Sequence, residues 1–362
     1  MPIKTIEQLR EHLQTAIELE HSTIPPYLCA MYTIAPGTNQ PSYEIIRSVV
    51  VEEMLHLTLA ANVLNAVGGE PSIDSPRFVP EYPSYLPDGE KEFKVHLLKF
   101  SKEALNTFLK IERPARLEPR AGAAANLQAI RSQDKYYLGM GDRYYTIGEF
   151  YEEIEKGLRE LVNQQGEKAV FTGNPTRQIT RDYYWASGGE VIEVRDLHSA
   201  ETALRVIVDQ GEGLPNSIFD LDHLRFGQPR EVAHYFRFQQ IVLGRYYKTG
   251  DKPDRPTGGP LEVDWDAVYN MKRDPKTNEY PEDSQARARS ADFNIGYTEF
   301  LRQLHSAFNG KRELLVPAVG NMFDIKYNAI ELIKNPFPGK EGLNAGPAFE
   351  YAGDATLEPS PG

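Results

Sequence analysis

The sequence predicts a mainly α-helical bundle with a mixed insertion and extra helices toward the C-terminus. Long segments near both ends of the chain repeat apolar residues at helical spacing. Prolines cluster in the segment that separates the N-terminal helices from the later ones, at positions 71, 76, 80, 83 and 87. The 362 residues are 40% hydrophobic and 25% charged, which is enough for a large core within a single domain, 1–362.

Two long helices are expected at the start of the chain. The first covers about 5–33, and its apolar stripe runs from Ile6 to Met31. Pro25-Pro26 removes two amide donors from that helix and predicts a kink. The second covers about 42–67 and ends at two glycines. Because the connection is short, the two helices should pack antiparallel.

The middle of the chain reads as an insertion, about 70–195, with short elements of mixed type. EFKVHLLKF (92–100) fits a strand or a short helix, and ARLEPRAGAAANLQ (115–128) has the composition of a loop. TIGEFYEEIEKGLRELV (146–162) predicts a helix that begins with a T-x-x-E capping box. Residues 165–195 suggest strands and turns.

Four further helices are expected after the insertion, together with a charged, proline-rich loop arm and a tail. Their order along the chain is helix about 196–212, helix about 229–246, loop arm 248–283, helices 284–310 and 311–334 (together about 284–334), and tail 335–362. The tail is rich in proline and glycine, and we expect it to run over the surface.

Composition excludes several classes of function. The formal net charge of −12 argues against a nucleic-acid partner and against an anionic membrane. No apolar run approaches the roughly 20 residues that span a bilayer, and the charged N-terminal segment does not resemble a secretory signal. The single cysteine, Cys29, allows no intrachain disulfide and is interpreted as a small core residue. These features together predict a cytoplasmic protein.

Polar residues that interrupt apolar stripes are the candidates for chemistry. Glu20 interrupts the first stripe, and Glu53 and His56 interrupt the second. Glu53 and His56 are three residues apart, so they share a face of the helix. In an antiparallel pair they lie at nearly the same height as Glu20, given a rise of about 1.5 Å per residue. A buried carboxylate or imidazole without a partner costs several kcal/mol or so, which predicts either a pairing or a bound metal.

The same pattern recurs later as Glu212, followed by Glu231-x-x-His234. A carboxylate and then Glu-x-x-His, both repeated, is typical of helical bundles that hold two iron or manganese ions. It requires that Glu212 end one helix and Glu231 begin the next. The predicted metal ligands are Glu20, Glu53, His56, Glu212, Glu231 and His234. Two iron ions per chain are favoured, and manganese or zinc stays open.

Each of these residues also has a purely structural interpretation. Glu53 and His56 would form a buried hydrogen-bonded pair, Glu20 would pair with His21 or an arginine, and Glu212 would be a surface residue. Glu231 would complement a helix N-terminus, and His234 would be a core histidine. Glu152 is an alternative third-helix ligand, and Glu52 would support the site from outside or lie at the surface.

Several motifs together resemble one family. They are AIELEHSTIPPYLCAMYTI, VVEEMLHLTLAANVLNAVGGEP, IGEFYEEIEKGL, VDQGEG, EVAHYFRF, LHSAFNGKRELLVPAVGNM and GPAFEY. The chain resembles, from about 5 to 352, the ferritin-like domain of iminophenylpyruvate dimer synthases, which are associated with violacein and rebeccamycin pathways. The resemblance implies a ferritin-like bundle. Glu20, Glu53 and His56 also match the first half of a rubrerythrin-like metal pattern.

The favoured function is a metal-dependent, di-iron type oxidase or oxygenase of a small, amino-acid-derived molecule in secondary metabolism. Its partners would be that substrate and dioxygen, in a pocket walled by the insertion and the loop arm. The alternatives are a ferritin-like protein that handles iron or scavenges peroxide, and a non-enzymatic scaffold with a relic metal site. A homodimer is compatible with an acidic helical bundle. The motifs of phosphate binding, serine hydrolysis and thiolate metal clusters are absent from the sequence.

Overall fold

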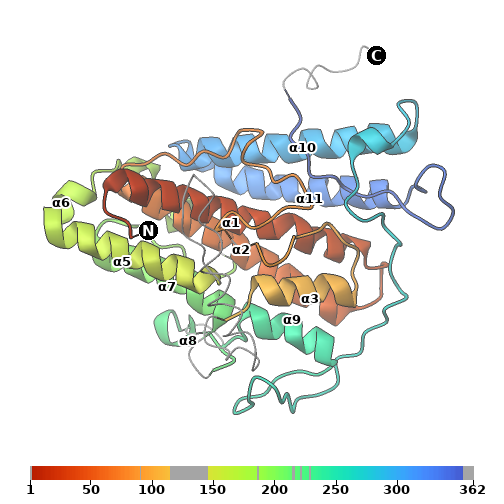
Figure 1. Cartoon of the computed structure of the whole chain (residues 1–362), viewed down its shortest axis with the longest axis horizontal. Coiled ribbons are helices and arrows are strands. Elements are labelled where there is room, and N and C mark those ends of the chain that lie inside the picture. Colours follow the sequence, from red (N-terminus) through yellow and green to blue (C-terminus); the bar gives the residue numbers. More distant parts are fainter. Residues whose placement is uncertain are drawn as a thin grey trace.

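The computed structural model describes residues 2–89, 91–114, 146–185, 187–213, 217–220, 222–227 and 230–353. The predicted mainly α, ferritin-like bundle with extra C-terminal helices is confirmed for this part of the chain (Figure 1). It contains isolated β-bridges but no β-strand within those residues. The loop predicted at 115–128 and the end of the tail, 354–362, lie outside the described residues.

Helices α1 (Ile6–Thr33) and α2 (Gln40–Ala66) form the centre of the bundle (Figure 1). They run antiparallel as predicted. Accordingly, Arg10 near the start of α1 donates to the carbonyl oxygen of Val67, just past the end of α2. Helix α1 continues through both prolines. Pro26 has no N–H to offer the carbonyl oxygen of Ser22, and the hydroxyl of Tyr82 donates to that oxygen instead, at 2.8 Å.

Four helices flank this central pair on two sides. Helix α3 (Lys102–Ile111) packs against α9 (His234–Leu243), and α5 (Ile147–Gln165) packs against α7 (Leu197–Glu212) (Figure 1). Helix α2 contacts both α7 and α9, and α1 contacts α3 and α5. The polar positions of α1 and α2 therefore face side chains from both flanking pairs.

Helices α10 (Gln285–Phe308) and α11 (Leu315–Ile333) pack on each other along the outer side of α1 (Figure 1). The hydroxyl of Tyr297 and Nε2 of His21 lie 2.6 Å apart, which ties α10 to α1. The Asn65 side-chain amide donates to the carbonyl oxygen of Phe308 at 2.8 Å, which ties α10 to α2. The short helix η4 (Arg312–Leu314) joins the two.

The strands predicted within 165–195 are wrong. The chain there forms α6 (Glu167–Val170) and the 3-10 helices η1 (Pro175–Arg177) and η2 (Arg181–Tyr183). Buried side chains, not strand pairing, satisfy the backbone: the Asn62 amide donates to the carbonyl oxygens of Ile179 and Ile192. Residues 92–100 are likewise neither strand nor helix, with one bridge between Ser84 and Val95.

The arm and the tail lie against the bundle. The arm 248–283 contains η3 (Thr277–Glu279) and forms an isolated bridge to α1's end, between Ile34 and Val268. The tail was expected at the surface, but Ala345, Ala348 and Phe349 are buried. Phe349 packs edge-on against Phe293 and Tyr297 of α10, so this part of the tail seals an apolar layer. The remaining short helix, α8, spans Asp222–Arg225.

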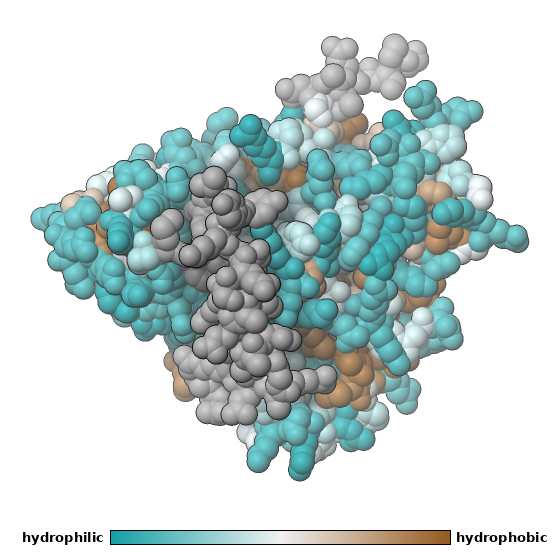
Figure 2. Space-filling view, in the orientation of Figure 1, coloured by the Kyte–Doolittle hydropathy of each residue, from teal (hydrophilic) through white to brown (hydrophobic). Residues whose placement is uncertain are grey.

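The visible surface is mostly hydrophilic with small hydrophobic patches (Figure 2). Among the described residues, none of the helices has the length and apolar character needed to cross a membrane. Cys29 is completely buried in the apolar core, as its interpretation as a core residue predicted.

Candidate metal centre

Helices α1 and α2 bring three of the predicted residues together. Nδ1 of His56 lies 3.3 Å from Oε2 of Glu20 and 3.9 Å from Oε2 of Glu53. All three side chains are at most 3% exposed. Their convergence follows from the antiparallel pairing of α1 and α2, which brings two interrupted apolar stripes face to face.

Helices α3 and α9 contribute two more residues from the other side. His234 is the first residue of α9, and its Nδ1 lies 2.9 Å from Oε1 of Glu53. Glu112 follows the last residue of α3, and its Oε2 lies 3.6 Å from the same Nδ1. Both side chains are buried.

The cluster therefore has two similar halves that share one carboxylate. His56 and Glu20 form one half, His234 and Glu112 form the other, and the two oxygens of Glu53 face different histidines. The two imidazole rings are stacked with centroids 5.3 Å apart. Ligand atoms of Glu53, His56 and His234 all lie within 4.8 Å of one another, close enough to bind a common metal ion.

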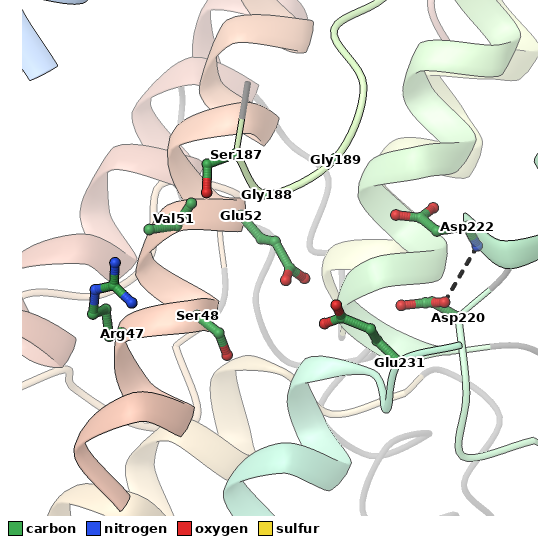
Figure 3. Close-up of a pocket in the computed structure, with 10 residues that line it drawn as sticks. All are labelled: Arg47, Ser48, Val51, Glu52, Ser187, Gly188, Gly189, Asp220, Asp222 and Glu231. Atoms are coloured by element: carbon green, nitrogen blue, oxygen red, sulfur yellow. Dashed lines mark hydrogen bonds between the residues drawn. The ribbon is translucent and has the colours of Figure 1, made fainter. Parts of the chain in front are cut away.

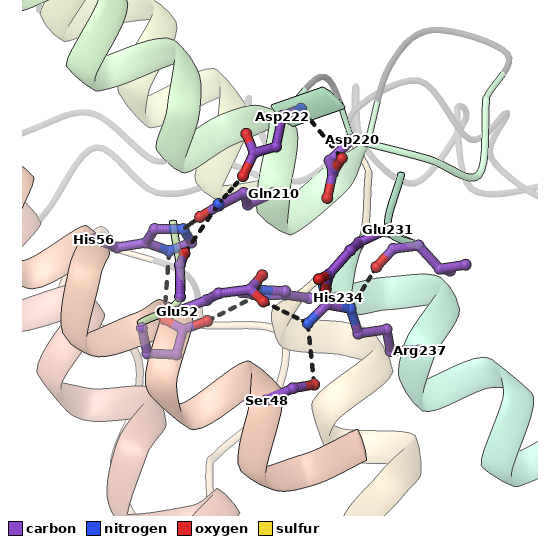
Figure 4. Close-up of polar contacts among 12 residues, drawn as sticks. Ser48, Glu52, His56, Gln210, Asp220, Asp222, Glu231, His234 and Arg237 are labelled. Carbon is purple, nitrogen blue, oxygen red and sulfur yellow. Dashed lines mark hydrogen bonds and ion pairs between the residues drawn. The ribbon is translucent and has the colours of Figure 1, made fainter. Parts of the chain in front are cut away.

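Each histidine is oriented by a contact between its Nε2 and a residue outside the cluster (Figure 4). Nε2 of His234 lies 2.9 Å from Oε2 of Glu52, which also accepts a hydrogen bond from Arg237. Nε2 of His56 lies 2.7 Å from Oε1 of Gln210. Because both partners are acceptors, Nε2 carries the proton in each ring. The usual role of such outer partners is to leave the other ring nitrogen, here Nδ1, as the one that would bind a metal in place of its proton.

The orientation of Gln210 is itself fixed by its other contacts. Its Nε2 donates to Oδ2 of Asp222 at 2.5 Å and to the carbonyl oxygen of Gly188 at 3.2 Å. Both of these groups accept hydrogen bonds, so the amide oxygen must face His56. The chain from Asp222 through Gln210 thus selects the tautomer of His56.

Hydroxyl groups hold the three carboxylates in a matching way. Tyr151 donates to Oε1 of Glu20 at 2.5 Å, and Tyr27 donates to Oε1 of Glu112 at 2.5 Å. In each case the other oxygen, Oε2, faces a histidine. Thr23 donates to Oε2 of Glu53 at 3.1 Å. The tyrosines' pKa values lie well above 10, because of burial and of the adjacent carboxylates, so both remain hydrogen-bond donors.

The electrostatics of the cluster favour a cation. Burial, followed by the charge of Glu112, raises the pKa of Glu53 to about 8. Burial alone would lower the pKa of His234, but Glu112, Glu52 and Glu53 outweigh it and hold that pKa well above its usual value. Burial would likewise raise the pKa of Glu52, but Arg237 and His234 keep it at about 2. Glu53 thus tends to retain a proton where a metal would supply the positive charge.

The structure does not bring Glu212 or Glu231 to this cluster. Glu212 ends α7, as the sequence required, but its Oε1 accepts a hydrogen bond from the Gly148 N–H in the first turn of α5. Glu231 precedes α9, in a segment where Val232 forms a bridge to Phe219. The three-residue spacing puts two side chains on one face only within a helix. We therefore leave both residues out of the candidate site.

The structure also defines the surroundings of three glutamates, Glu231, Glu152 and Glu52. The carboxylate of Glu231 accepts a hydrogen bond from Arg237 at 2.7 Å. Glu152, the alternative third-helix ligand, is exposed on α5 and lines a surface cavity instead. Glu52, expected either to support the site or to lie at the surface, is buried and takes the supporting role.

Glu112 was missed because it lies in the proline-rich insertion. A signal for it exists in KEALNTFLKIE, where Leu105, Phe108 and Ile111 are buried at helical spacing. Glu112 continues that stripe, four residues after Phe108 and seven after Leu105. The test that selected Glu20 would have selected Glu112 as well.

The residues present fit a divalent metal ion. Nδ1 of His234 is buried and makes no hydrogen bond, although two carboxylates lie beside it. A buried nitrogen without a hydrogen bond needs a partner, and a metal ion held by the neighbouring carboxylates would be one. Three carboxylates and two imidazoles suit iron, manganese or zinc.

A helical bundle with a buried, shared Glu/His cluster is compatible with the carboxylate-bound dinuclear metal proteins. The chain belongs to the ferritin-like family, whose model, described as "Ferritin-like", matches residues 13–243. The crystal structure of a ferritin-like protein from Caulobacter vibrioides has a similar fold, with a TM-score of 0.62 and 23% identity. The similarity covers 97% of this chain and 100% of that one. No curated protein matches the sequence.

Proposed function

We propose that this protein is a metal-dependent oxidase or oxygenase that uses dioxygen on a small organic molecule. The carrying observation is the buried cluster of Glu20, Glu53, Glu112, His56 and His234. Two iron ions held there would supply redox chemistry with dioxygen. The five side chains leave part of each metal's coordination shell to water, dioxygen or substrate.

Charge supports an anionic substrate. The three carboxylates carry one negative charge fewer than two divalent cations require. The carboxylate of an amino-acid-derived molecule would balance that charge, which agrees with the resemblance to iminophenylpyruvate dimer synthases.

A cavity of about 250 Å³ between α5 and α7 is the proposed substrate pocket. Tyr151 lines it and donates to Glu20, so a bound molecule lies one side chain away from the metal ligands. Arg205 and Glu155 also line it, next to Leu204 and Val208. A small zwitterion would meet both charges and an apolar wall there. The predicted wall from the arm 248–283 is absent among the residues that line this cavity.

The chain's own residues would orient the reacting groups and exclude water. Tyr151, Tyr27 and Thr23 fix the carboxylates, and Gln210 and Glu52 fix the imidazoles. Such outer contacts hold a site within the narrow geometry that its chemistry needs. All three of these residues are buried. The raised pKa values of Tyr151 and Tyr27 mean that each phenol keeps its proton and donates it in the hydrogen bond to its carboxylate.

The first experiment measures metal content and oxygen consumption of the full chain. After anaerobic loading with iron and removal of weakly bound metal by desalting, we expect about two tightly bound ions per chain in the wild type and close to none in Glu53→Ala. Oxygen consumption should then depend on added aromatic amino acids or their imines. Val208→Phe, which fills the cavity, should lower this consumption while metal content stays the same. Absence of bound metal in the wild type would contradict the proposal.

The same assay separates the alternative of iron handling or peroxide scavenging. In that case the protein would consume oxygen or peroxide with ferrous iron alone, and Val208→Phe would have no effect. A scaffold with a relic site would hold negligible metal.

A further inference from the structure

A second cavity, of about 190 Å³, lies on the outer side of both histidines. Figure 3 shows its lining, in which four carboxylates from three segments converge. They are Glu52 of α2, Asp220 and Asp222 at the approach to α8, and Glu231 before α9. The backbone of 187–189 closes another side. The candidate substrate pocket shares none of these residues.

We propose that this carboxylate pocket binds a hydrated divalent metal ion and supplies it to the metal centre. The supply role rests on the proposed function, whereas the binding of an ion in the pocket does not. No residue of the pocket belongs to the five proposed ligands, so this is a separate site.

An unpartnered buried oxygen points to a ligand. Asp222 is 4% exposed, and its Oδ2 accepts a hydrogen bond from Gln210. Its Oδ1 is buried and has no hydrogen-bond partner. A buried carboxylate oxygen without a donor is costly, and a water of a hydrated cation would provide the donor.

The charges of the pocket favour a cation over an anion. Its lining includes one guanidinium, that of Arg47, which is 59% exposed and pairs with Glu44. The guanidinium of Arg237 contacts Glu52 and Glu231. The four carboxylates still outnumber these two cations by two. Burial, followed by the charge of Asp222, raises the pKa of Asp220 to about 7. The second of these causes is the repulsion between the two carboxylates.

The geometry indicates an ion that keeps its water shell. Among the described residues, no three carboxylates of the pocket bring ligand atoms within 4.8 Å of one another, as Glu53, His56 and His234 do. Direct coordination by the pocket is therefore not expected, but its volume accommodates several waters. Small divalent cations such as Mg²⁺ give up their hydration reluctantly and are often held through water.

The position of the pocket connects it to both halves of the centre (Figure 4). Asp222 reaches His56 through Gln210, and Glu52 contacts His234 directly. An ion collected here lies one layer of side chains from the proposed ligands. A negative, hydrated vestibule raises the local concentration of cations.

The site is tested with Mn²⁺ as the probe, on the full metal-free chain. Electron paramagnetic resonance distinguishes free from bound Mn²⁺. In a Glu53→Ala background, where the centre is disabled, we expect one weakly bound Mn²⁺ per chain. Adding Asp222→Asn or Asp220→Asn should weaken that binding at least about tenfold. Asp283→Asn, which removes an exposed charge before α10, is the matched control and should leave it unchanged.

The supply role is tested by the rate at which limiting Mn²⁺ fills the centre of the protein with Glu53 intact. The carboxylate of Asp220 accepts a hydrogen bond from the Asp222 N–H, whereas Nε2 of each histidine is held by another residue, Gln210 or Glu52. Asp220→Asn should therefore slow filling at least threefold relative to Asp283→Asn.

Three results would overturn parts of this inference in distinguishable ways. If Glu53→Ala binds no Mn²⁺, the pocket is not a metal site, and this conclusion does not depend on whether the intact centre binds metal. Equal filling rates in Asp220→Asn and Asp283→Asn remove the supply role. Tighter binding of ethylammonium than of Mn²⁺ assigns the pocket to organic cations. If Mn²⁺ binds in the Glu53→Ala background but the intact centre takes none, the proposed function fails and the pocket remains.

Discussion

At the scale of single residues, each carboxylate of the centre accepts a hydrogen bond from a hydroxyl group through one oxygen. At least one oxygen of each carboxylate also faces a histidine. Tyr151 with Glu20 and Tyr27 with Glu112 are equivalent pairs in the two halves. This equivalence supports Glu112 as a candidate ligand, because Tyr27 holds it in the same way as Tyr151 holds the predicted ligand Glu20. Glu212 has a different environment, at the N-terminal end of α5.

A matched pair of substitutions tests this assignment. Glu112→Gln keeps the size of the side chain but removes the charge beside His234, and we expect about one metal ion per chain instead of two. Glu212→Gln changes the same residue type and should retain both ions. Elemental analysis after anaerobic loading measures each. If Glu212→Gln loses an ion and Glu112→Gln does not, the ligand is Glu212, as predicted from the sequence, and not Glu112.

Asp220 gives a pH dependence of stability whose sign is defined. Burial and Asp222 raise its pKa to about 7 in the folded protein, from an ordinary value of 3.8. Between about pH 4 and pH 7 the folded state therefore binds more protons than the unfolded state, so this group's contribution to stability falls as pH rises. Asp220→Asn removes the contribution.

We expect the free energy of unfolding of metal-free Asp220→Asn to decline less than that of the wild type between pH 5 and pH 7.5. Urea denaturation at a series of pH values measures it. Asp283→Asn serves as the control and should follow the wild type. A steeper decline in Asp220→Asn would contradict the assigned direction of the pKa.

At the scale of secondary-structure elements, the helices that carry regular apolar stripes were predictable. The expected helices at about 5–33 and 42–67 correspond to α1 (Ile6–Thr33) and α2 (Gln40–Ala66). Their three site residues were found because each breaks a periodic pattern. The helix predicted at 229–246 is shorter, since α9 begins at His234. That difference of one turn is what removes Glu231 from the site.

Elements held by side chains were not predictable from local pattern. Residues 165–195 look like strands, yet side chains bind their backbone. The distant Asn62 contacts the backbone of Ile179 and Ile192, and Oε1 of Gln178 accepts a hydrogen bond from the Val194 N–H. Gln210 was missed for the same reason. A single glutamine on an amphipathic helix gives no periodic signal, and its role appears only when α7 packs beside His56.

Helix α1 offers a test of how a proline-containing helix is completed. Tyr82→Phe removes the hydroxyl that donates to the carbonyl oxygen of Ser22. That oxygen would then lack a buried partner, and we expect a loss of about 1–3 kcal/mol in the free energy of unfolding. Tyr85→Phe alters a tyrosine that is 45% exposed and should change stability little. Chemical denaturation compares the two, and equal effects would show that the Tyr82 hydroxyl contributes no such stabilisation.

At the scale of the whole molecule, metal and fold are expected to stabilise each other. The five proposed ligands come from α1, α2, the end of α3 and the start of α9, so an assembled site exists only in the folded chain. An ion that binds only that state contributes about 2.7 kcal/mol when its free concentration is 100 times its dissociation constant.

Thermal unfolding with and without a chelator tests this coupling. Loaded wild type should unfold several degrees higher than the chelated protein, and Glu53→Ala should show no such difference. A shift of the same size in Glu53→Ala would place the stabilising ions somewhere other than this centre.

The span of the ligands along the chain also sets an order of events during synthesis. Glu20 is made early, whereas His234 follows more than 200 residues later. A nascent chain that has not yet extended beyond α9 holds Glu20, Glu53 and His56 without their partners. Complete metal loading must therefore come after the ribosome has passed α9, and the centre is assembled as a late step of maturation.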